Sequence, residues 1–363
     1  MSTTIRPATA RTSALGPVRC TCRPLTRPAG RAGHGPRCAL TRRRLLAGGM
    51  AGLGLLAAGC SPSGEPAASP STGPRRIEHA YGVTEVPDDA ERIVVLGYTD
   101  IEVALALGVV PVGYTDFFGS GLNEWAAPLA GNATPESWEL TDGMPLERIL
   151  SLAPDLVIAS DALQRADYDQ LSAAVPTVGP FRPEGAYGVP WREHTRRTAL
   201  ILGLEERGEE LIAELEAAYA EARAAHPVFA ERTVTYCWPI EPDYYVYNDT
   251  DPRVQIVLEL GLRLTDHALE LAEENANRRE AGMPISPERL DLLDADVIVA
   301  QSYGPERTAA EANRLFQTIP AVARGDLIWL PERVSDGLAF GTVLSTGAVL
   351  GELVELLATA LET

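Results

Sequence analysis

The stretches ERILSLAPDLVIA at 147–159 and ERLDLLDADVIVA at 288–300 carry one pattern twice, 141 residues apart. Each copy opens on Glu-Arg, continues with helical spacing of leucines, and ends in an aliphatic run preceded by an aspartate. Such a pattern predicts a short helix followed by a buried strand. Two copies at a domain-sized separation indicate two lobes of related topology.

Further strands and helices are predicted around both copies. In the first lobe, the run at 92–97, the helical pattern at 101–107 and the run at 109–113 predict a β-α-β unit. The fourth strand of this lobe is expected at 175–179. The second lobe repeats this order with strands at 232–237, 262–264 and 326–330 and a helix at 254–260. The predicted fold class is therefore α/β, with two Rossmann-like lobes of mainly parallel sheets.

One long helix is expected to join the lobes. The segment 191–225 contains no proline, and its apolar residues recur at three, four or seven positions. Gly203 and Gly208 are the two positions at which this helix can bend. The predicted organisation is an N-terminal lobe at 76–188, a linking backbone helix at 189–227 and a C-terminal lobe at 228–363. A single stiff helix predicts lobes that move little against each other.

The first 59 residues read as a targeting signal. A twin-arginine pattern at 41–46 opens an apolar run, 45–58, that is too short to span a bilayer as a helix. The segment 56–60, LAAGC, resembles a bacterial lipoprotein box, with its leucine one position further from Cys60 than usual. Cys60 is therefore expected to carry a lipid. An ordinary secretory signal is the alternative.

Composition supports an exported, tethered protein. The segment 60–75 is rich in Ser, Pro and Gly and predicts a flexible tether. The formal charge is −19, but residues 1–60 hold ten arginines and no acid, so the rest of the chain carries −29. This charge argues against nucleic acid or a polybasic membrane contact. Only Cys237 lies in the folded part, where we expect a buried, inert thiol.

The sequence contains few of the residue patterns that enzymes use for catalysis. The chain has no lysine, which excludes a Schiff-base lysine and the lysine of a P-loop. The four histidines of the body are scattered without metal-ligand spacing, and no G-x-S-x-G elbow is present. We therefore predict no enzyme, no catalytic residue and no directly bound metal. A membrane-anchored hydrolase is the alternative from a different class.

The loops that follow the predicted strands define a candidate binding cleft, because ligands of parallel α/β sheets bind beyond the carboxyl ends of the strands. These loops carry a large share of the aromatic residues. The predicted ligand-binding residues are Tyr98, Thr99, Tyr114, Phe117, Ser160, Tyr187, Trp238, Tyr245, Tyr303, Arg307 and Phe340. The segment 243–248, DYYVYN, is either an extra hairpin with packed tyrosines or a wall facing the ligand.

Several motifs in order resemble one known family. They are HAYGVTE at 79–85, RIVVLG at 92–97, ALGVVPVG at 106–113, LAPDLVI at 152–158 and the leucine-aspartate pattern at 290–299. Together with the lipoprotein box, this order looks like the iron–siderophore substrate-binding lipoproteins of bacterial ABC importers, over about residues 76–363. The resemblance implies the helical-backbone (class III) type of periplasmic binding protein, with two lobes around a ligand.

The resemblance also implies the ligand, partners and location. A ferric siderophore would be held between the lobes and delivered to a membrane permease with its ATPase. The protein would have no cofactor, would act as a monomer, and would be lipid-anchored on the outer face of the cell membrane. Cobalamin or haem is the alternative ligand, since relatives that bind them share the LAPDL signature.

Permease docking is assigned to Glu147 and Glu288. Members of the family dock through one acidic residue on each lobe, and these two glutamates repeat in register. A role in complementing a helix dipole is the competing explanation. For the ligand, the charge of −29 favours neutral or cationic hydroxamates over anionic catecholates. Arginines near the predicted cleft can reverse that preference: Arg182, Arg253, Arg307 and Arg333.

Overall fold

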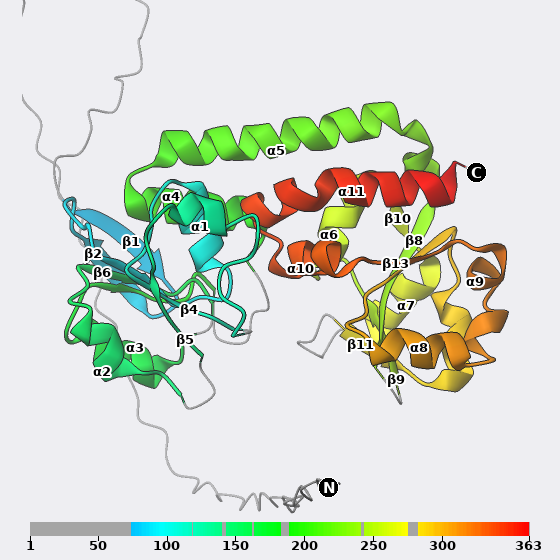
Figure 1. Ribbon diagram of the computed structural model, residues 1–363, viewed down its shortest axis with the longest axis horizontal. Helices are drawn as coiled ribbons and strands as arrows, with labels where there is room; N and C mark the ends of the chain where they lie inside the picture. Colours follow the sequence, from blue (N-terminus) through cyan, green and yellow to red (C-terminus); the bar gives the residue numbers. More distant parts are fainter. Residues whose placement is uncertain are drawn as a thin grey trace, which may run out of the picture. The chain divides into compact units, whose positions relative to one another are not determined.

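The computed structural model describes residues 74–117, 119–139, 143–161, 163–182, 189–240, 243–274 and 282–362. The predicted signal region, Cys60 and Tyr187 lie outside these ranges. Residues 74–362 belong to one compact unit that contains two open sheets (Figure 1).

The first sheet has five parallel strands in the order β5-β4-β3-β6-β7. Its strands are β3 (Ile93–Val95), β4 (Gly113–Thr115), β5 (Glu136–Trp138), β6 (Leu156–Ile158) and β7 (Thr177–Val178). An antiparallel hairpin precedes it, formed by β1 (Arg75–His79) and β2 (Gly82–Val86). The helices of this lobe are α1 (Asp100–Ala106), η1 (Ala127–Ala130), α2 (Leu146–Ser151) and α3 (Arg165–Ser172). The central strands are buried along their whole length, as aliphatic strands of parallel sheets are.

The second sheet has six strands in the order β11-β9-β8-β12-β13, with β10 also beside β8. The strands are β8 (Thr233–Ile240), β9 (Asp243–Tyr247), β10 (Arg263–Leu264), β11 (Gly282–Ile285), β12 (Val297–Ala300) and β13 (Leu327–Trp329). β8, β10, β12 and β13 run parallel, whereas β9 and β11 are antiparallel to their neighbours. The α/β class with mainly parallel sheets is thus confirmed.

Helices of the second lobe surround this sheet. They are α6 (Pro252–Leu258), α7 (Asp266–Glu274), η3 (Pro287–Leu293), α8 (Pro305–Ala312), η4 (Phe316–Thr318), α9 (Pro320–Arg324), α10 (Glu332–Phe340) and α11 (Val343–Leu361). A further short helix, η2 (Pro227–Glu231), leads into β8. α11 is long and apolar enough to cross a membrane by length and composition, but it packs as a core helix with Val349, Leu353 and Leu357 fully buried.

The repeated sequence forms equivalent strands in both lobes. β6 lies between β3 and β7, and β12 lies between β8 and β13. The repeated aspartates also make equivalent hydrogen bonds in the two lobes. Asp155 Oδ2 accepts a hydrogen bond from the Arg92 backbone N–H at 2.8 Å, and Asp296 Oδ2 accepts one from Thr233 at 2.7 Å. Each carboxylate therefore fixes the start of the neighbouring central strand, β3 or β8.

The connection between the lobes corrects the prediction of one long helix. Two helices are present, α4 (Trp191–Leu202) and α5 (Glu205–Ala225). Gly203 ends α4 in the left-handed conformation, φ 70°, which costs glycine little and reverses the chain. Ion pairs of Arg192 with Glu216 and of Arg196 with Glu209 show that the two helices run antiparallel.

Gly208 does not bend α5 but lets it approach α4. A Cβ built at this position would lie 2.6 Å from the Ala199 Cβ. α5 then reaches from one lobe to the other: Leu211 packs against the α1–α4 cluster, and Leu215 and Tyr219 are buried in the core of the second lobe. α11 runs alongside α5 and contacts α1 as well as β12 and β13 (Figure 1). Two helices, not one, thus bridge the sheets.

The close approach at Gly208 generates a stability prediction. Gly208→Ala should lower the free energy of unfolding by about 1 to 3 kcal/mol, because the added methyl overlaps a neighbouring backbone-anchored methyl. Gly351→Ala in α11 is the matched control. Its Cβ would meet nothing within 4 Å, so helix propensity alone should raise stability by about 1 kcal/mol. Urea unfolding of both variants measures the change in the free energy of unfolding. Equal stabilisation by both substitutions would show that α4 and α5 are not tightly packed at Gly208.

Candidate ligand-binding cleft

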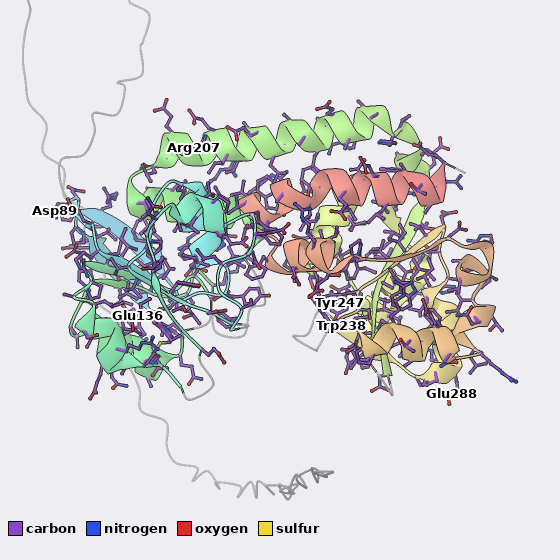
Figure 2. The ribbon with its side chains drawn as sticks, viewed as in Figure 1. Asp89, Glu136, Arg207, Trp238, Tyr247 and Glu288 are labelled. Carbon is purple, nitrogen blue, oxygen red and sulfur yellow. The ribbon has the colours of Figure 1, made fainter. Side chains whose placement is uncertain are left out.

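A cavity of about 520 Å³ lies between residues of the two lobes, within the range of small-molecule sites. It is lined by Tyr98, Ser120, Asn123, Trp238, Arg253, Gln301, Tyr303, Glu332, Asp336, Ala339 and Phe340. Tyr98 and Gln301 lie just beyond the carboxyl ends of β3 and β12, and Trp238 lies within the last part of β8, near the edge where the topology predicts a site. Figure 2 shows Trp238 on the inner edge of the second lobe.

Aromatic rings form much of the wall. Tyr98 stacks on Phe340, with ring centroids 5.2 Å apart and 15° between the planes, and it meets Phe117 edge-on at 5.1 Å. On the other side, Trp238 and Tyr303 meet edge-on at 5.7 Å. These contacts hold the rings in place before any ligand arrives, which reduces the entropy lost on binding.

Asp100 holds the loop that presents Tyr98. Its Oδ2 accepts hydrogen bonds from the backbone N–H groups of Gly97 (2.8 Å) and Ser160 (3.0 Å), and its Oδ1 lies 2.8 Å from His194 Nε2. Because a carboxylate can only accept, Nε2 carries the proton, and Nδ1 of the same ring lies 3.2 Å from the Thr99 hydroxyl. The network joins two strand-end loops to α4.

The opposite wall contains a polar chain through Gln301. Arg253 is 7% exposed; its Nε and Nη2 donate to both oxygens of Asp251, and its Nη1 donates to Gln301 Oε1 at 2.9 Å. Gln301 Nε2 in turn donates to the Tyr303 hydroxyl at 2.8 Å. Burial opposes the charge of Arg253, but the hydrogen bonds that it donates to Asp251 outweigh this effect and raise the pKa of Arg253. The guanidinium also lies 4.1 Å from the Tyr247 ring centroid.

Two acidic residues sit near the Tyr303 end of the cleft. Burial, helped by the charge of Asp336, raises the pKa of Tyr303 to about 12. Burial and then the Glu332 charge raise the pKa of Asp336 above its ordinary value.

Glu102 ties the cleft to the bridging helix α11. It is 1% exposed and accepts hydrogen bonds from Asn123 Nδ2, Trp125 Nε1 and the Thr342 hydroxyl, the last at 2.7 Å. Thr342 is the N-cap of α11. Burial raises the pKa of Glu102, although these donors oppose the shift. The carboxylate therefore positions Asn123 at the cleft and joins α1 to the start of α11.

Four predicted ligand residues line the cavity: Tyr98, Trp238, Tyr303 and Phe340. Tyr114 and Phe117 lie beside it, around a smaller pocket that shares Tyr98 and Phe340. Tyr114 is 5% exposed, so it forms the floor of that pocket rather than the main cleft.

The other predicted ligand residues are placed elsewhere. Thr99 and Ser160 are buried, and both belong to the Asp100 network described above. Tyr245 lies on β9 opposite Trp238, and Arg307 lies on α8, paired with Glu311; neither lines the cavity. The hairpin alternative for 243–248 is present as β9, with Tyr244 buried against Phe316. Tyr187 lies outside the described residues.

Several lining residues were not predicted as ligand contacts. Glu332 and Asp336 come after the strand predicted at 326–330, where a loop was expected, but this segment forms the helix α10. Asn123 and Ser120 follow no strand directly. Arg253 opens α6 after the capping aspartate Asp251, and the D-P-R sequence at 251–253 is the signal that marks this helix start.

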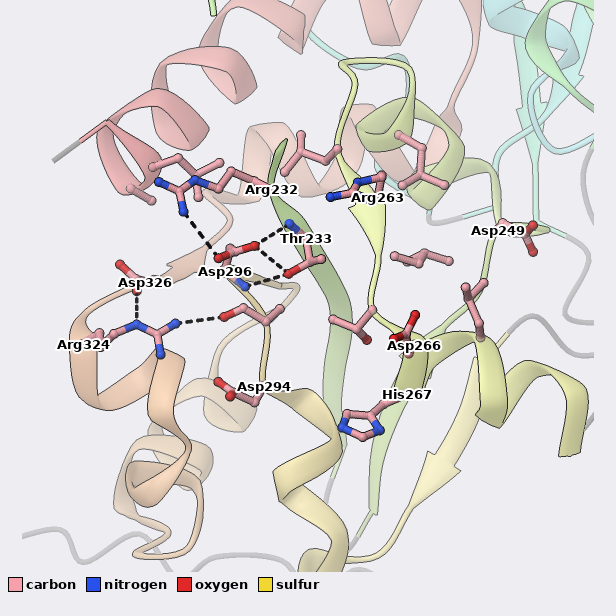
Figure 3. Close-up of a pocket in the computed structure, with 18 residues that line it drawn as sticks. Arg232, Thr233, Asp249, Arg263, Asp266, His267, Asp294, Asp296, Arg324 and Asp326 are labelled. Carbon is pink, nitrogen blue, oxygen red and sulfur yellow. Dashed lines mark hydrogen bonds and ion pairs between the residues drawn. The ribbon is translucent and has the colours of Figure 1, made fainter. Parts of the chain in front are cut away.

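A larger cavity, about 1120 Å³, lies at the opposite end of the second sheet (Figure 3). Four of its charged residues are paired with one another: Arg232 with Asp296 at 3.5 Å and Arg324 with Asp326 at 2.7 Å. It surrounds the amino ends of the strands, where parallel sheets do not bind ligands.

Among the described residues, no cluster of three His, Cys, Asp or Glu side chains could hold a metal ion. The inter-lobe cleft is therefore the candidate site.

The fold and cleft define a two-lobed substrate-binding protein, and the family comparison agrees. The family model described as periplasmic binding protein matches residues 93–334, and the chain belongs to this family. It is 25% identical over 297 residues to the probable siderophore-binding lipoprotein YfiY of Bacillus subtilis, covering 77% of this chain and 89% of that protein.

Other relatives carry related names. The chain is 26% identical over 279 residues to the Fe(3+)-citrate-binding protein YfmC of Bacillus subtilis, covering 75% of this chain and 84% of that protein. Among solved structures, PiaA of Streptococcus pneumoniae TIGR4 in complex with ferrichrome has a TM-score of 0.67 and 25% identity. The match covers 79% of this chain and 99% of PiaA.

The Asp100 network can be tested by stability. Asp100→Ala leaves three buried donors without an acceptor and should lower the free energy of unfolding by about 3 kcal/mol or more. Asp100→Asn should cost much less, because its amide oxygen keeps both backbone bonds and its NH₂ can donate to the other His194 tautomer. Asp89→Ala, at an exposed aspartate, is the control. Equal losses for all three variants in urea unfolding would contradict the assigned role.

Proposed function

We propose that this chain captures a ferric siderophore in the inter-lobe cleft and delivers it to the permease of an ABC importer. The observation that carries the proposal is the cavity of about 520 Å³ with aromatic rings from both lobes, in a chain of the periplasmic binding protein family. The relatives support the ligand class, since one is named for siderophore binding and PiaA was solved with ferrichrome.

The cleft chemistry suits such a ligand. A ferric siderophore presents apolar edges and carbonyl or hydroxamate oxygens around the iron, so it requires flat apolar walls and a few donors. The walls are Tyr98, Phe340, Trp238 and Tyr303. Trp238 Nε1 is buried without a hydrogen-bond partner in the described part of the chain. Arg253 uses three of its five N–H donors internally, leaving two for acceptor oxygens.

A hydrolase is the less favoured function, although Thr99, His194 and Asp100 have the hydroxyl–imidazole–carboxylate order of a catalytic triad. Thr99 is 9% exposed and His194 is 2% exposed, so the hydroxyl is poorly placed to meet a substrate. Both Asp100 oxygens also hold neighbouring loops in place. We assign the three residues to positioning, and turnover of generic ester substrates would contradict that assignment.

Binding of a ferric siderophore can be measured as a change in the tryptophan fluorescence of the protein. We expect ferric hydroxamate siderophores to quench the purified protein, and Trp238→Phe to remove most of the quenching, because Trp238 lines the cleft. Trp329→Phe is the control, since Trp329 stacks on Phe316 outside the cavity lining. Binding of cobalamin or haem, with no response to any ferric chelate, would replace the siderophore by the alternative ligand.

We further propose that Glu147 and Glu288 are the permease contacts. Both are exposed, one in the first turn of α2 and the other in the first turn of η3. In Figures 1 and 2, α2 and Glu288 lie on the side away from α5 and α11. A hydrogen bond from Ser286 lowers the pKa of Glu288, which keeps this carboxylate charged for an arginine of the permease.

Docking and binding are separable by mutation. The double change Glu147→Ala and Glu288→Ala should abolish uptake of the iron–siderophore complex while leaving its affinity for the purified protein unchanged. Glu205→Ala with Glu206→Ala removes the same charge from the exposed first turn of α5 and should import normally. Normal uptake by the first variant at equal expression would leave the two glutamates with a helix-dipole role alone.

The N-terminal predictions complete the proposal. Lipid on Cys60 would anchor the protein, as a monomer, on the outer face of the cell membrane, and the relative YfiY is named a lipoprotein. Cys60 and the tether lie outside the described residues.

A further inference from the structure

The arginines that could have attracted an anionic ligand are each paired with a carboxylate. Arg182 pairs with Glu193 at 2.6 Å, Arg307 with Glu311 at 2.8 Å, and Arg333 with Glu124 and Glu352. Arg253, the cation that lines the cavity, makes a two-pronged pair with Asp251. Its positive charge is therefore compensated within the protein.

The cavity also has two carboxylates, Glu332 and Asp336, four residues apart on α10 and therefore on one face of it. Within the described residues, neither carboxylate is paired with an arginine or histidine. Asp336 lines the cavity together with the Tyr303 hydroxyl, and Glu332 adds a like charge nearby. Two negative charges at one end of an aromatic cleft, without an ion pair to a cation of the described residues, are a poor environment for an anion.

The residues around Glu332 and Asp336 show how the cleft would bind a positively charged group. The Tyr303 hydroxyl accepts from Gln301 Nε2 at 2.8 Å, and the carboxylates of Glu332 and Asp336 line the same cavity, where they can accept from a ligand donor. The rings of Tyr98, Trp238 and Tyr303 line the same cavity, and the face of an aromatic ring attracts positive charge. Arg253 belongs to the same lining, and its two remaining N–H groups are the donors for the chelate oxygens.

We propose, building on the proposed function, that Glu332 and Asp336 are specificity-determining residues that select ferric hydroxamate chelates bearing a positive charge, such as a pendant ammonium group. The ammonium binds at the α10 end of the cleft, and the iron-bound hydroxamates lie among the aromatic rings. Ferric tris-catecholates, which carry several negative charges, are rejected by the same two carboxylates.

A matched ligand series tests this selection. The probes are the ferric complexes of a linear trihydroxamate ending in a primary amine, of its N-acetyl derivative and of its N-succinyl derivative, with a ferric tris-catecholate as the fourth. We expect the purified protein to bind the amine complex about tenfold more tightly than the acetyl complex, the scale of one charge-assisted hydrogen bond, and the two anionic complexes more weakly still.

Variants separate local contact from overall charge. Glu332→Gln with Asp336→Asn should reduce the preference for the amine complex over the acetyl complex to about one, while binding of the acetyl complex persists. Glu205→Gln with Glu206→Gln changes the net charge equally on the far helix α5 and should preserve the preference. Urea unfolding of each variant establishes that it is folded before binding is measured.

The possible failures are distinguishable. Equal affinity for the amine and acetyl complexes, or tighter binding of the succinyl or catecholate complex, overturns the charge selection while leaving siderophore binding intact. If the α5 control also loses the preference for the amine complex, that preference comes from the long-range field of the whole protein. This result overturns the role of Glu332 and Asp336. Failure to bind any of the four ferric complexes overturns the proposed function itself.

Discussion

The carboxylate that precedes the repeated strand in each lobe determines how the central strands meet. Asp155 accepts from the backbone of Glu91 and Arg92, and Asp296 accepts from the backbone of Thr233. In both lobes, the bond joins the start of one central strand to the start of its parallel neighbour, so it fixes their register. Parallel strands in fixed register end at the same edge, and from that edge the loops bearing Tyr98 and Gln301 reach the cleft.

The predictable part of the fold is the part encoded locally. The aliphatic runs of β3, β6, β8 and β12 are short and continuous, and their repetition indicated two parallel sheets. The connection at 191–225 was predicted wrongly, because the helical pattern continues through a glycine that takes the left-handed conformation. Gly208 lies where two helices must nearly touch, a constraint set by tertiary packing that no local pattern reveals.

The residues of the candidate site also fall into two groups: those that the local sequence predicts, and those that packing between the lobes brings to the cleft. Tyr98, Trp238 and Tyr303 could be predicted as cleft residues, because each stands at or near a strand end. Asn123, Glu332 and Asp336 come from a coil and from α10, whose proximity to the cleft is decided by packing between lobes. Thr99 and Ser160 also follow strands, yet the Asp100 network draws their loops inward. Position after a strand selects an edge of the sheet but not the direction of each side chain.

The two bridging helices affect how an importer could recognise a loaded protein. α5 and α11 both have packing contacts in each lobe, and Glu102 fastens the first turn of α11 to α1. We expect a receptor braced in this way to present nearly the same outer surface whether it is empty or full. Empty copies would then compete with loaded ones for the same permease, and the permease would have to detect the cargo through the open cleft rather than from a change in the receptor's shape.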